Sequence, residues 1–220
     1  MSSSTVENYL KAILHLEGEG GGTTTVGEIA RELAVTPGTV TIMMRHLKER
    51  GLVAYEPRRG LSLRPLGTSE AMKVVRRHRL IETFLVEVMG LDWSEVHEEA
   101  EILEHVISDR LLDRIDKMLG EPTHDPHGDP IPDRDGIVAK DRAVPLLEVE
   151  AGRYRVVRVS DEDSALLGWL NEKGLKIGEE IDLSHSDRVA GVLELSRDGG
   201  ARLQLGVQVA GQVFVEAVTG

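Results

Sequence analysis

Four side chains that could bind a metal ion recur at helical spacing near the middle of the chain. His97, Glu101, Glu104 and His105 stand at positions i, i+4, i+7 and i+8, so a continuous helix would carry them on one face. Glu101, Glu104 and His105 could bring two oxygens and a nitrogen to one ion. Because the chain has no Cys, the ligands would be imidazole, carboxylate or carbonyl groups. These suit Mn²⁺ and Fe²⁺, with Zn²⁺, Co²⁺ and Ni²⁺ as competitors in vitro.

Further ligand pairs flank this helix. His78 and Glu82 are again at i and i+4, while Asp125 and His127 stand two residues apart in a Pro-rich stretch that could reach back to His78. An ordinary solvated, Glu-rich helix surface is the alternative reading. Against it, residues 80–109 contain nine carboxylates and no Lys or Arg. Such a cluster repels itself unless a cation compensates it.

The charge is distributed unevenly along the chain. The net charge is −12, yet residues 1–77 carry 11 basic against 8 acidic side chains, and residues 78–220 carry 15 against 30. The first part is therefore compatible with a nucleic-acid partner in spite of the overall acidity. With 40% hydrophobic residues, no apolar run long enough to span a bilayer and no apolar signal core, we expect a soluble, cytoplasmic protein without a membrane partner.

The elements that must position these residues begin with three short helices. Apolar periodicity predicts helices over residues 5–17, 26–33 and 37–50, with Thr36 as N-cap and Pro37 at the first helical position of the third. Two short strand-like runs between residues 52 and 63 flank a basic turn and predict a hairpin. This order indicates a winged helix-turn-helix.

The third helix and the hairpin supply the candidate DNA contacts. Small residues at the start of the helix suit close approach to the major groove, and basic residues suit phosphate contacts. The candidates are Thr36, Pro37, Gly38, Thr39, Thr41, Arg45, Lys48, Arg58 and Arg59. The alternative is that these charges are merely solvated and that the three helices form a core or protein-interaction module.

The rest of the chain predicts two more domains. Helical periodicity from about residue 67 to 89 and from 93 to 119 gives long helices that could pair two subunits, and a Pro-rich linker follows. Alternating apolar and polar residues after residue 143 predict a small SH3-like β-barrel. The predicted fold class is α+β with three domains: a winged helix over 1–72, an all-α dimerisation and metal-binding domain over 73–142, and the barrel over 143–220.

Several stretches together resemble the DtxR/MntR family of metal-dependent repressors over nearly the whole length. They are Glu7-Asn-Tyr-Leu10, Arg77-His-Arg-Leu-Ile-Glu82, Val96-His-Glu-Glu-Ala-Glu101 with Glu104-His105, and Pro126-His-Gly-x-Pro-Ile-Pro132. The resemblance implies a winged helix, a helical dimerisation domain, a linker and a barrel similar to the FeoA domain, in that order.

The resemblance also implies two metal sites. A regulatory site would use Glu101, Glu104 and His105 with Asn8 of the first helix. An ancillary site would draw on His78, Glu82, His97, Asp125, His127 and an acidic residue of the barrel, for which Asp163 is the candidate. Iron-sensing members have Cys where this chain has Glu101, which favours Mn²⁺ over Fe²⁺. The chain departs from manganese sensors at Asn8, where they usually carry Asp.

The function expected from these features is a manganese-dependent or iron-dependent repressor of metal-uptake genes, not an enzyme. The ion would tie the first helix to the dimerisation helices and so set the spacing of two recognition helices in a homodimer on a palindromic operator. Two alternatives stay open: a carboxylate-bridged metalloenzyme, and a metal-independent winged-helix adaptor.

Overall fold

The computed structural model describes residues 3–18, 22–139, 142–160, 163–187, 189–197 and 202–218. The chain separates into two compact units, each built from three segments. Unit 1 comprises Met1–His78, Ile102–Asp109 and Pro132–Val138, and unit 2 comprises Arg79–Glu101, Arg110–Ile131 and Ala139–Gly220. The three domain boundaries expected from the sequence stay a prediction.

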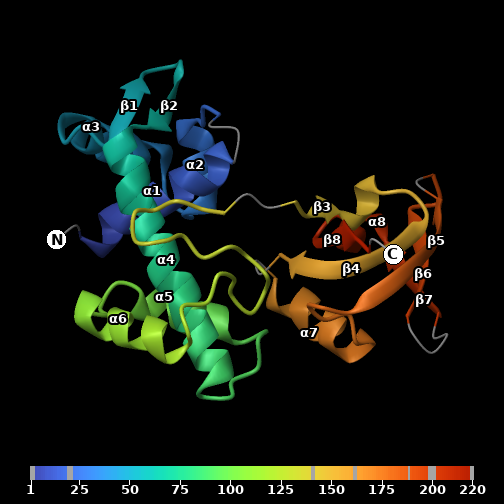
Figure 1. Cartoon of the computed structure of the whole chain (residues 1–220). Helices are drawn as coiled ribbons and strands as arrows, with labels where there is room; N and C mark the ends of the chain where they lie inside the picture. The colour runs from blue at the N-terminus through green and yellow to red at the C-terminus, as the bar shows by residue number, and fades with distance from the viewer. Residues whose placement is uncertain are drawn as a thin grey trace. The chain divides into compact units, whose positions relative to one another are not determined.

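Unit 1 contains the predicted helix-turn-helix and wing (Figure 1). Its elements are α1 (Ser4–Glu17), α2 (Val26–Glu32), α3 (Pro37–Glu49), β1 (Val53–Glu56) and β2 (Gly60–Leu63), followed by the first part of α4 (Pro65–Glu87). Local sequence sets the helix starts, because each cap satisfies backbone N–H groups that the first turn leaves unpaired. Thr25 and Glu28 form a capping box on α2, and Thr36 caps α3 with Pro37 in its first turn.

One apolar cluster holds these elements together. Leu10 and Ile13 of α1, Ile29 of α2, and Met44 and Leu47 of α3 are fully buried in it. The strands β1 and β2 pair antiparallel from Val53↔Leu63 to Glu56↔Gly60. The outer face of α3 and the hairpin tip therefore project from a fixed core.

The second of the two predicted central helices is interrupted, whereas α4 has the predicted length. A single helix over residues 93–119 was expected, but α5 (Val96–Leu103) ends before Glu104, and α6 (Asp109–Met118) begins after a turn. Two features oppose continuation: carboxylates are unfavourable at the negative end of the helix dipole, and β-branched Val106 and Ile107 have low helix propensity. The expectation that one helix face carries all four candidate ligands was therefore wrong, because Glu104 and His105 lie in the turn.

The Pro-rich stretch is folded back on itself rather than extended. His124 and Pro130 form an antiparallel bridge around the segment that carries Asp125 and His127. Gly128 lies at φ +86°, and a Cβ there would stand 2.0 Å from the Val157 carbonyl oxygen. The Val159 N–H also donates to the His127 carbonyl at 2.9 Å. Only glycine allows this close approach to the neighbouring strand.

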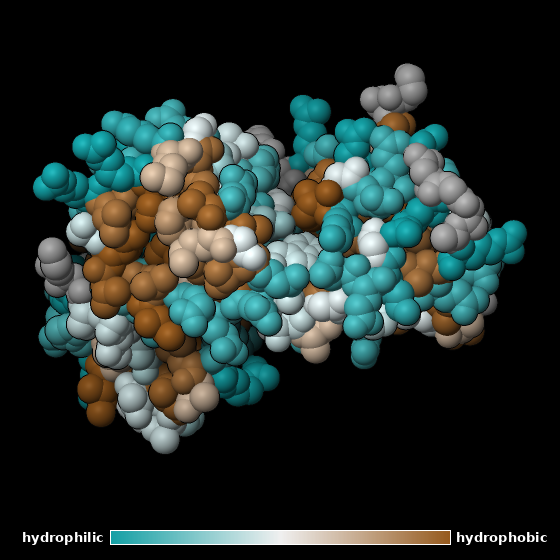
Figure 2. All heavy atoms as spheres, turned by 90° about the horizontal axis from the view of Figure 1, so that it is seen from below, coloured by the Kyte–Doolittle hydropathy of each residue, from teal (hydrophilic) through white to brown (hydrophobic). Residues whose placement is uncertain are grey.

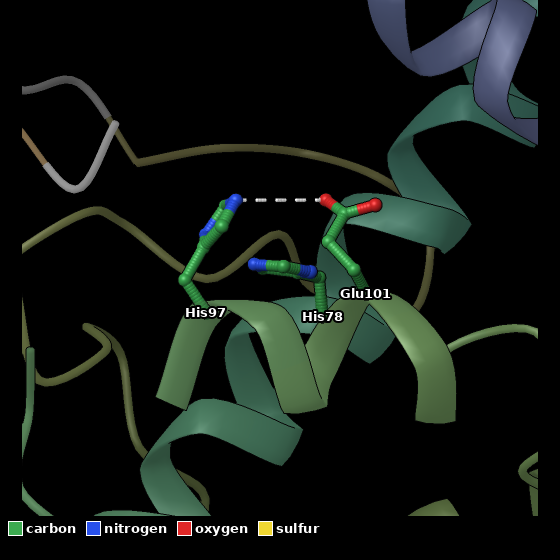
Figure 3. A group of neighbouring side chains, drawn as sticks. All are labelled: His78, His97 and Glu101. Atoms are coloured by element: carbon green, nitrogen blue, oxygen red, sulfur yellow. Dashed lines mark ion pairs between the residues drawn. The ribbon is translucent and has the colours of Figure 1, made fainter. Parts of the chain in front are cut away.

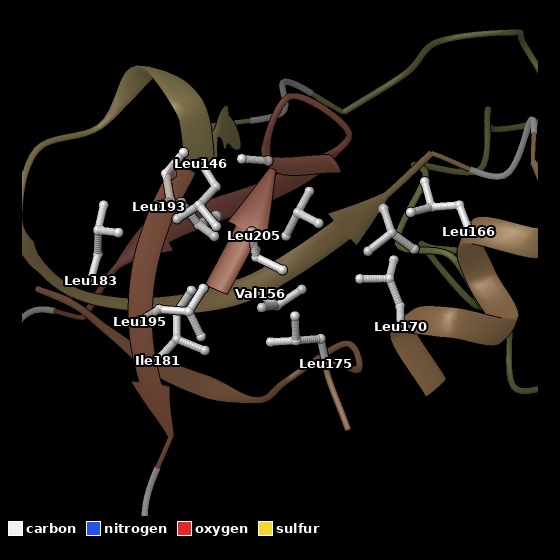
Figure 4. Packing of buried hydrophobic residues seen from close by; sticks show 14 of the residues in the cluster. Leu146, Val156, Leu166, Leu170, Leu175, Ile181, Leu183, Leu193, Leu195 and Leu205 are labelled. Atoms are coloured by element: carbon white, nitrogen blue, oxygen red, sulfur yellow. The ribbon is translucent and has the colours of Figure 1, made fainter. Parts of the chain in front are cut away.

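The C-terminal part of unit 2 is an antiparallel sheet of six strands in the order β3-β8-β4-β5-β6-β7. The strands are β3 (Val144–Pro145), β4 (Gly152–Val159), β5 (Glu180–Asp187), β6 (Val192–Arg197), β7 (Arg202–Gly206) and β8 (Val213–Ala217), with η1 (Leu146–Glu148), α7 (Ser164–Lys173) and α8 (Val207–Ala210) between them. Register shifts in β4 and β5 bend the sheet. Figure 4 shows Leu and Ile side chains from several strands and from α7 converging on its core. The predicted α+β class is confirmed.

Large apolar side chains remain exposed along the central helices and the turns beside them. They are Val88, Met89, Ile102, Leu103, Val106, Leu111 and Met118. Figure 2 shows exposed apolar residues on the surface of the helical part. Among the described residues, no helix is both long enough and apolar enough to cross a membrane.

Candidate metal centres and nucleic-acid interface

Glu104 and His105 form the first group of potential ligands, within unit 1. The two side chains approach at 3.4 Å between Glu104 Oε1 and His105 Nε2. Both atoms are buried, and neither has a hydrogen-bond partner among the residues that the structure describes. Leaving such atoms unsatisfied costs roughly 1–3 kcal/mol each. A cation bound between them would satisfy both.

The other atoms of these two side chains are held in place. Glu104 Oε2 accepts hydrogen bonds from Lys11 Nζ at 2.9 Å and from His78 Nδ1 at 2.6 Å. His105 Nδ1 lies 2.7 Å from Glu7 Oε2. A carboxylate only accepts, so Nδ1 donates here, and Nε2 is the ring nitrogen left to bind an ion. A carboxylate hydrogen-bonded to the other ring nitrogen is usual for a His that binds a metal ion.

Charge around Glu104 is compensated. Burial would raise the pKa of its carboxyl group, but the hydrogen bond from His78 and the charge of Lys11 outweigh burial and lower that pKa. Glu7 is similarly paired, with Arg77 Nη2 at 2.9 Å from Glu7 Oε1. The α1 helix thus contributes a carboxylate and an ammonium group to this region of unit 1.

Asn8 follows Glu7 on α1 and was implicated by resemblance. Its Oδ1 is buried and has no hydrogen-bond partner within the described part of the chain. A buried amide oxygen with no donor is unusual. The residue therefore fits a ligand role, although a neutral amide attracts a cation less than the carboxylate of Asp would.

Glu82, Asp125 and His127 form the second group, within unit 2. All three are buried, and they offer ligand atoms within 4.8 Å of one another. His127 Nε2 lies 2.7 Å from the Trp93 carbonyl oxygen, so Nε2 must donate and Nδ1 presents its lone pair. That Nδ1 is 3.9 Å from Glu82 Oε2. The ring also stacks on Trp93, with centroids 5.7 Å apart.

Asp125 is held by the turn that it closes. Its Oδ1 accepts from the His127 and Asp129 N–H groups, both at 2.9 Å, and its Oδ2 lies 3.6 Å from Arg79 Nε. Burial first, and then the carboxylates of Asp129 and Glu82, raise the pKa of Asp125 well above its ordinary value, although Arg79 lowers it. Burial and the neighbouring carboxylates therefore disfavour the charged form of Asp125.

His97 and Glu101 extend the ligand supply of unit 2. His97 Nδ1 is 3.3 Å from Glu82 Oε1, and His97 Nε2 is 3.8 Å from Glu101 Oε1. Figure 3 shows His97 and Glu101 facing each other one turn apart on α5, and the third side chain drawn, His78, comes from α4. Asp163, by contrast, is used locally: its Oδ1 caps α7 by accepting from the N–H groups of Ala165 and Leu166.

The candidate DNA contacts lie on α3 and the wing. Thr36 and Thr39 hydroxyls bond each other at 2.9 Å, and the Thr41 hydroxyl donates to the Pro37 carbonyl at 2.9 Å. Lys48 is engaged too, because its Nζ donates to the Tyr55 carbonyl at 2.9 Å.

The other basic candidates are Arg45 and the two arginines of the hairpin tip. Arg45 is exposed on α3. At the tip, Arg58 has φ +69°, and Arg59 pairs with exposed Glu56 at 3.1 Å. Exposed ion pairs of this kind contribute little and exchange readily. Arg45, Arg58 and Arg59 therefore stay the best candidates for phosphate contacts.

Sequence reasoning missed the residues that hold the ligands. Glu7, Lys11 and Arg77 were not singled out, nor was the Trp93 carbonyl group. Glu7 and Lys11 do stand at i and i+4 on α1, which puts them on one helix face. Glu7 and Arg77 also begin two of the stretches that carry the family resemblance, but neither signal names His105 or Glu104 as a partner.

Comparisons with known proteins agree with this architecture. Three family models match: "Iron dependent repressor, N-terminal DNA binding domain" over residues 1–61, "Iron dependent repressor, metal binding and dimerisation domain" over 64–133, and "FeoA domain" over 144–217. The diphtheria toxin repressor of Corynebacterium efficiens is 33% identical over 98% of this chain and 96% of its own length. The iron-dependent repressor IdeR of Mycobacterium leprae is 33% identical, with 97% of each chain covered.

Solved structures give the same result. A manganese-dependent transcriptional repressor in complex with manganese superposes with a TM-score of 0.90 at 36% identity, covering 97% of this chain and 100% of that one. Fold and comparisons together define a metal-dependent, DNA-binding transcriptional repressor. The chain belongs to the iron-dependent repressor family, with an appended FeoA domain.

Proposed function

We propose that Mn²⁺ is the activating ion and that the protein is a manganese-dependent repressor of metal-uptake genes. Asn8, Glu101, Glu104 and His105 would bind the regulatory ion. Oxygen and nitrogen ligands without sulfur suit Mn²⁺, and Glu101 stands where the resemblance places Cys in iron-sensing members. The manganese complex among the structural neighbours is consistent with this choice.

One observation carries the proposal: Glu104 Oε1 and His105 Nε2 are buried, 3.4 Å apart and without hydrogen-bond partners in the described part of the chain. Glu7 fixes the His105 tautomer, and Lys11 with His78 holds the opposite oxygen of Glu104. The ion would supply a positive charge shared by ligands from α1 and from the turn after α5. The Glu7 contact orients His105 before the ion arrives.

A second ion would bind at Glu82, Asp125 and His127, with His78 and His97 as further candidate ligands. The raised pKa of Asp125 reflects crowded, buried carboxylates, which a divalent cation would neutralise. Asp163 is the weakest candidate, because one of its oxygens already caps α7.

Ion binding would favour the DNA-competent arrangement of a homodimer. The exposed apolar side chains between residues 88 and 118 would supply the dimer contact. Two α3 helices would then enter successive major grooves of a palindromic operator, with Arg45, Arg58 and Arg59 on the phosphates. The protein would act in the cytoplasm and catalyse no reaction.

The test is fluorescence-anisotropy binding of the chelator-stripped, full-length protein to the DNA upstream of its own gene. We expect Mn²⁺ to strengthen binding by tenfold or more, about 1.4 kcal/mol of coupling, at lower concentrations than Fe²⁺ under anaerobic conditions. Glu101→Ala should abolish the gain, whereas the control Glu99→Ala, an exposed carboxylate of the same helix, should retain it.

Three results would overturn parts of this proposal. Equal affinity with and without either ion would favour a metal-independent adaptor. Activation by Fe²⁺ alone would leave a metal-dependent repressor but contradict the assignment of manganese. Turnover of a substrate by the metal-loaded protein would point to the metalloenzyme alternative.

A further inference from the structure

An isoleucine occupies the middle of the solvent-facing side of α3. Ile42 has 71% of its surface exposed, although Val40, Met44 and Leu47 of the same helix are completely buried. At about 100° per residue, Ile42 points almost directly away from those three residues. This is the face that a helix-turn-helix protein presents to DNA.

The residues around Ile42 leave it as the central group of that face. Gly38 and Thr39 precede it by one turn, Arg45 and His46 follow it by one turn, and all four are exposed. Gly38 has no side chain and Thr39 is bonded to Thr36, so neither covers Ile42. The side chain therefore stands clear between a helix start that can approach closely and a basic residue.

The hydrogen-bonding capacity of this helix face is limited. The Thr41 hydroxyl donates within the helix, and the Thr36 and Thr39 hydroxyls bond each other. Arg45 is the long donor nearby, and it lies about 5 Å further along the helix axis. Hydroxyls that donate can still accept, so the first two turns offer acceptors with few free donors, and apolar contact at Ile42 adds a second means of discrimination.

The major groove offers one apolar feature for such contact. Thymine alone carries a 5-methyl group there, while cytosine presents an amino donor, and adenine and guanine present polar edges. Ile42 can neither donate nor accept a hydrogen bond, so a polar base edge beneath it would lose water without gaining a partner. Thymine is the one base whose contact with Ile42 buries apolar surface on both sides.

We propose that Ile42 determines base specificity by packing against the 5-methyl group of a thymine in each half-site. This inference rests on the proposed entry of α3 into the major groove. It adds which residue and which base set the preference for a DNA sequence. Arg45 and the wing arginines would set affinity through phosphates, whereas Ile42 would set which base pair is preferred at one position.

The expected loss of DNA affinity follows from the burial of one methyl group. Removing the thymine methyl from one half-site should weaken binding by about fourfold, the effect of one buried methyl or methylene group. Salt should change the overall affinity strongly through the phosphate contacts, but should leave this ratio nearly constant.

The experiment uses full-length protein loaded with Mn²⁺ and a duplex selected from a random pool for tightest binding. Each thymine of that duplex is replaced in turn by deoxyuridine, which lacks only the methyl group. Wild type and Ile42→Ala are compared by anisotropy at fixed salt. Ile137→Ala is the matched control, because Ile137 is an isoleucine of unit 1 with 65% of its surface exposed outside the helix-turn-helix.

The proposal predicts that one thymine per half-site shows a penalty of about fourfold with wild type and Ile137→Ala, and none with Ile42→Ala. It is overturned if every deoxyuridine penalty is the same for wild type and Ile42→Ala, or if Ile42→Ala changes oligomeric state instead of the thymine profile. Failure to select any DNA, with or without metal, would overturn it together with the proposed function. DNA binding that does not depend on Mn²⁺ but still weakens, through Ile42, when the thymine methyl group is removed would overturn the manganese proposal alone.

Discussion

The two groups of potential ligands use the same residue types but differ in electrostatic balance. Glu104 lies between Lys11 and His78, and its pKa is lowered. Asp125 lies near Glu82 and Asp129, and its pKa is raised well above the ordinary value despite Arg79. The partners of Glu104 therefore favour its charged form, whereas burial and neighbouring carboxylates disfavour the charged form of Asp125.

This difference suggests different consequences of metal loss. At Glu104 and His105, a bound ion would change the contacts that these side chains make with residues of α1. This helix belongs to the core of the winged helix. At Asp125 and His127, ion binding would relieve repulsion within unit 2. We expect the first group to control DNA binding and the second mainly to control stability.

The largest effect should come from distorting the turn that carries Asp125 and His127. Gly128→Ala places a Cβ 2.0 Å from the Val157 carbonyl oxygen at φ +86°, so the turn bearing Asp125 and His127 must move. We expect a loss of about 3 kcal/mol or more and a melting temperature lower by about 6–12 °C. Gly90→Ala is the control: its φ is +73° with no atom within 4 Å of the added Cβ, so about 1–2 kcal/mol is expected. Equal losses would contradict this account.

A smaller effect should follow from removing the Lys11 ammonium group beside Glu104. Lys11→Met leaves the buried Glu104 carboxylate with His78 but without the ammonium group. Because Lys11 is partly exposed, we expect the metal-free protein to lose only about 1–2 kcal/mol. Calorimetry should show Mn²⁺ binding tightened by roughly threefold to tenfold, since a positive charge has gone. The control Lys73→Met removes an exposed pair with Glu70 and should change neither stability nor Mn²⁺ affinity. Weaker Mn²⁺ binding in Lys11→Met would contradict this prediction, because it would show that Lys11 chiefly positions Glu104.

The smallest effect should appear when the buried charge of Asp125 is removed. A raised pKa means that the folded state favours protonated Asp125, so stability from this group is lost as pH rises above the ordinary value of 3.8. Asp125→Asn should raise the melting temperature of the metal-free protein at neutral pH by about 2–4 °C and reduce the increase caused by Mn²⁺.

The control for that substitution is Asp133→Asn. Asp133 accepts backbone N–H groups through the same kind of turn but is exposed. Scanning fluorimetry with chelator and with Mn²⁺ would measure both variants. A lower metal-free melting temperature for Asp125→Asn alone would mean that the lost N–H···carboxylate bonds outweigh the relieved repulsion.

Local signals in the sequence predicted the elements of the winged helix. Thr36 followed by Pro37 specifies a helix start through backbone geometry and capping, and both lie in one short segment. The early end of α5 was missed, because apolar periodicity continues through residues that form a turn. Periodicity records which residues share a face if a helix forms, and does not show where the helix ends.

The candidate ligands were predictable by type, but their partners were not. His105 pairs with Glu7 across 98 positions, and Glu104 pairs with Lys11 across 93. Spacing rules act within a single element, whereas these contacts arise from tertiary packing. The opposite pKa shifts of Glu104 and Asp125 therefore emerged only from the folded structure.

The central claim is best tested by the same substitution in each group: His105→Ala and His127→Ala. Mn²⁺-dependent DNA affinity and the Mn²⁺-dependent melting temperature would be measured for both variants and for wild type. We predict that His105→Ala loses the Mn²⁺-induced gain in DNA affinity, while His127→Ala retains most of it and loses much of the thermal stabilisation. The account would be contradicted if His127→Ala abolished Mn²⁺-dependent DNA binding while His105→Ala preserved it.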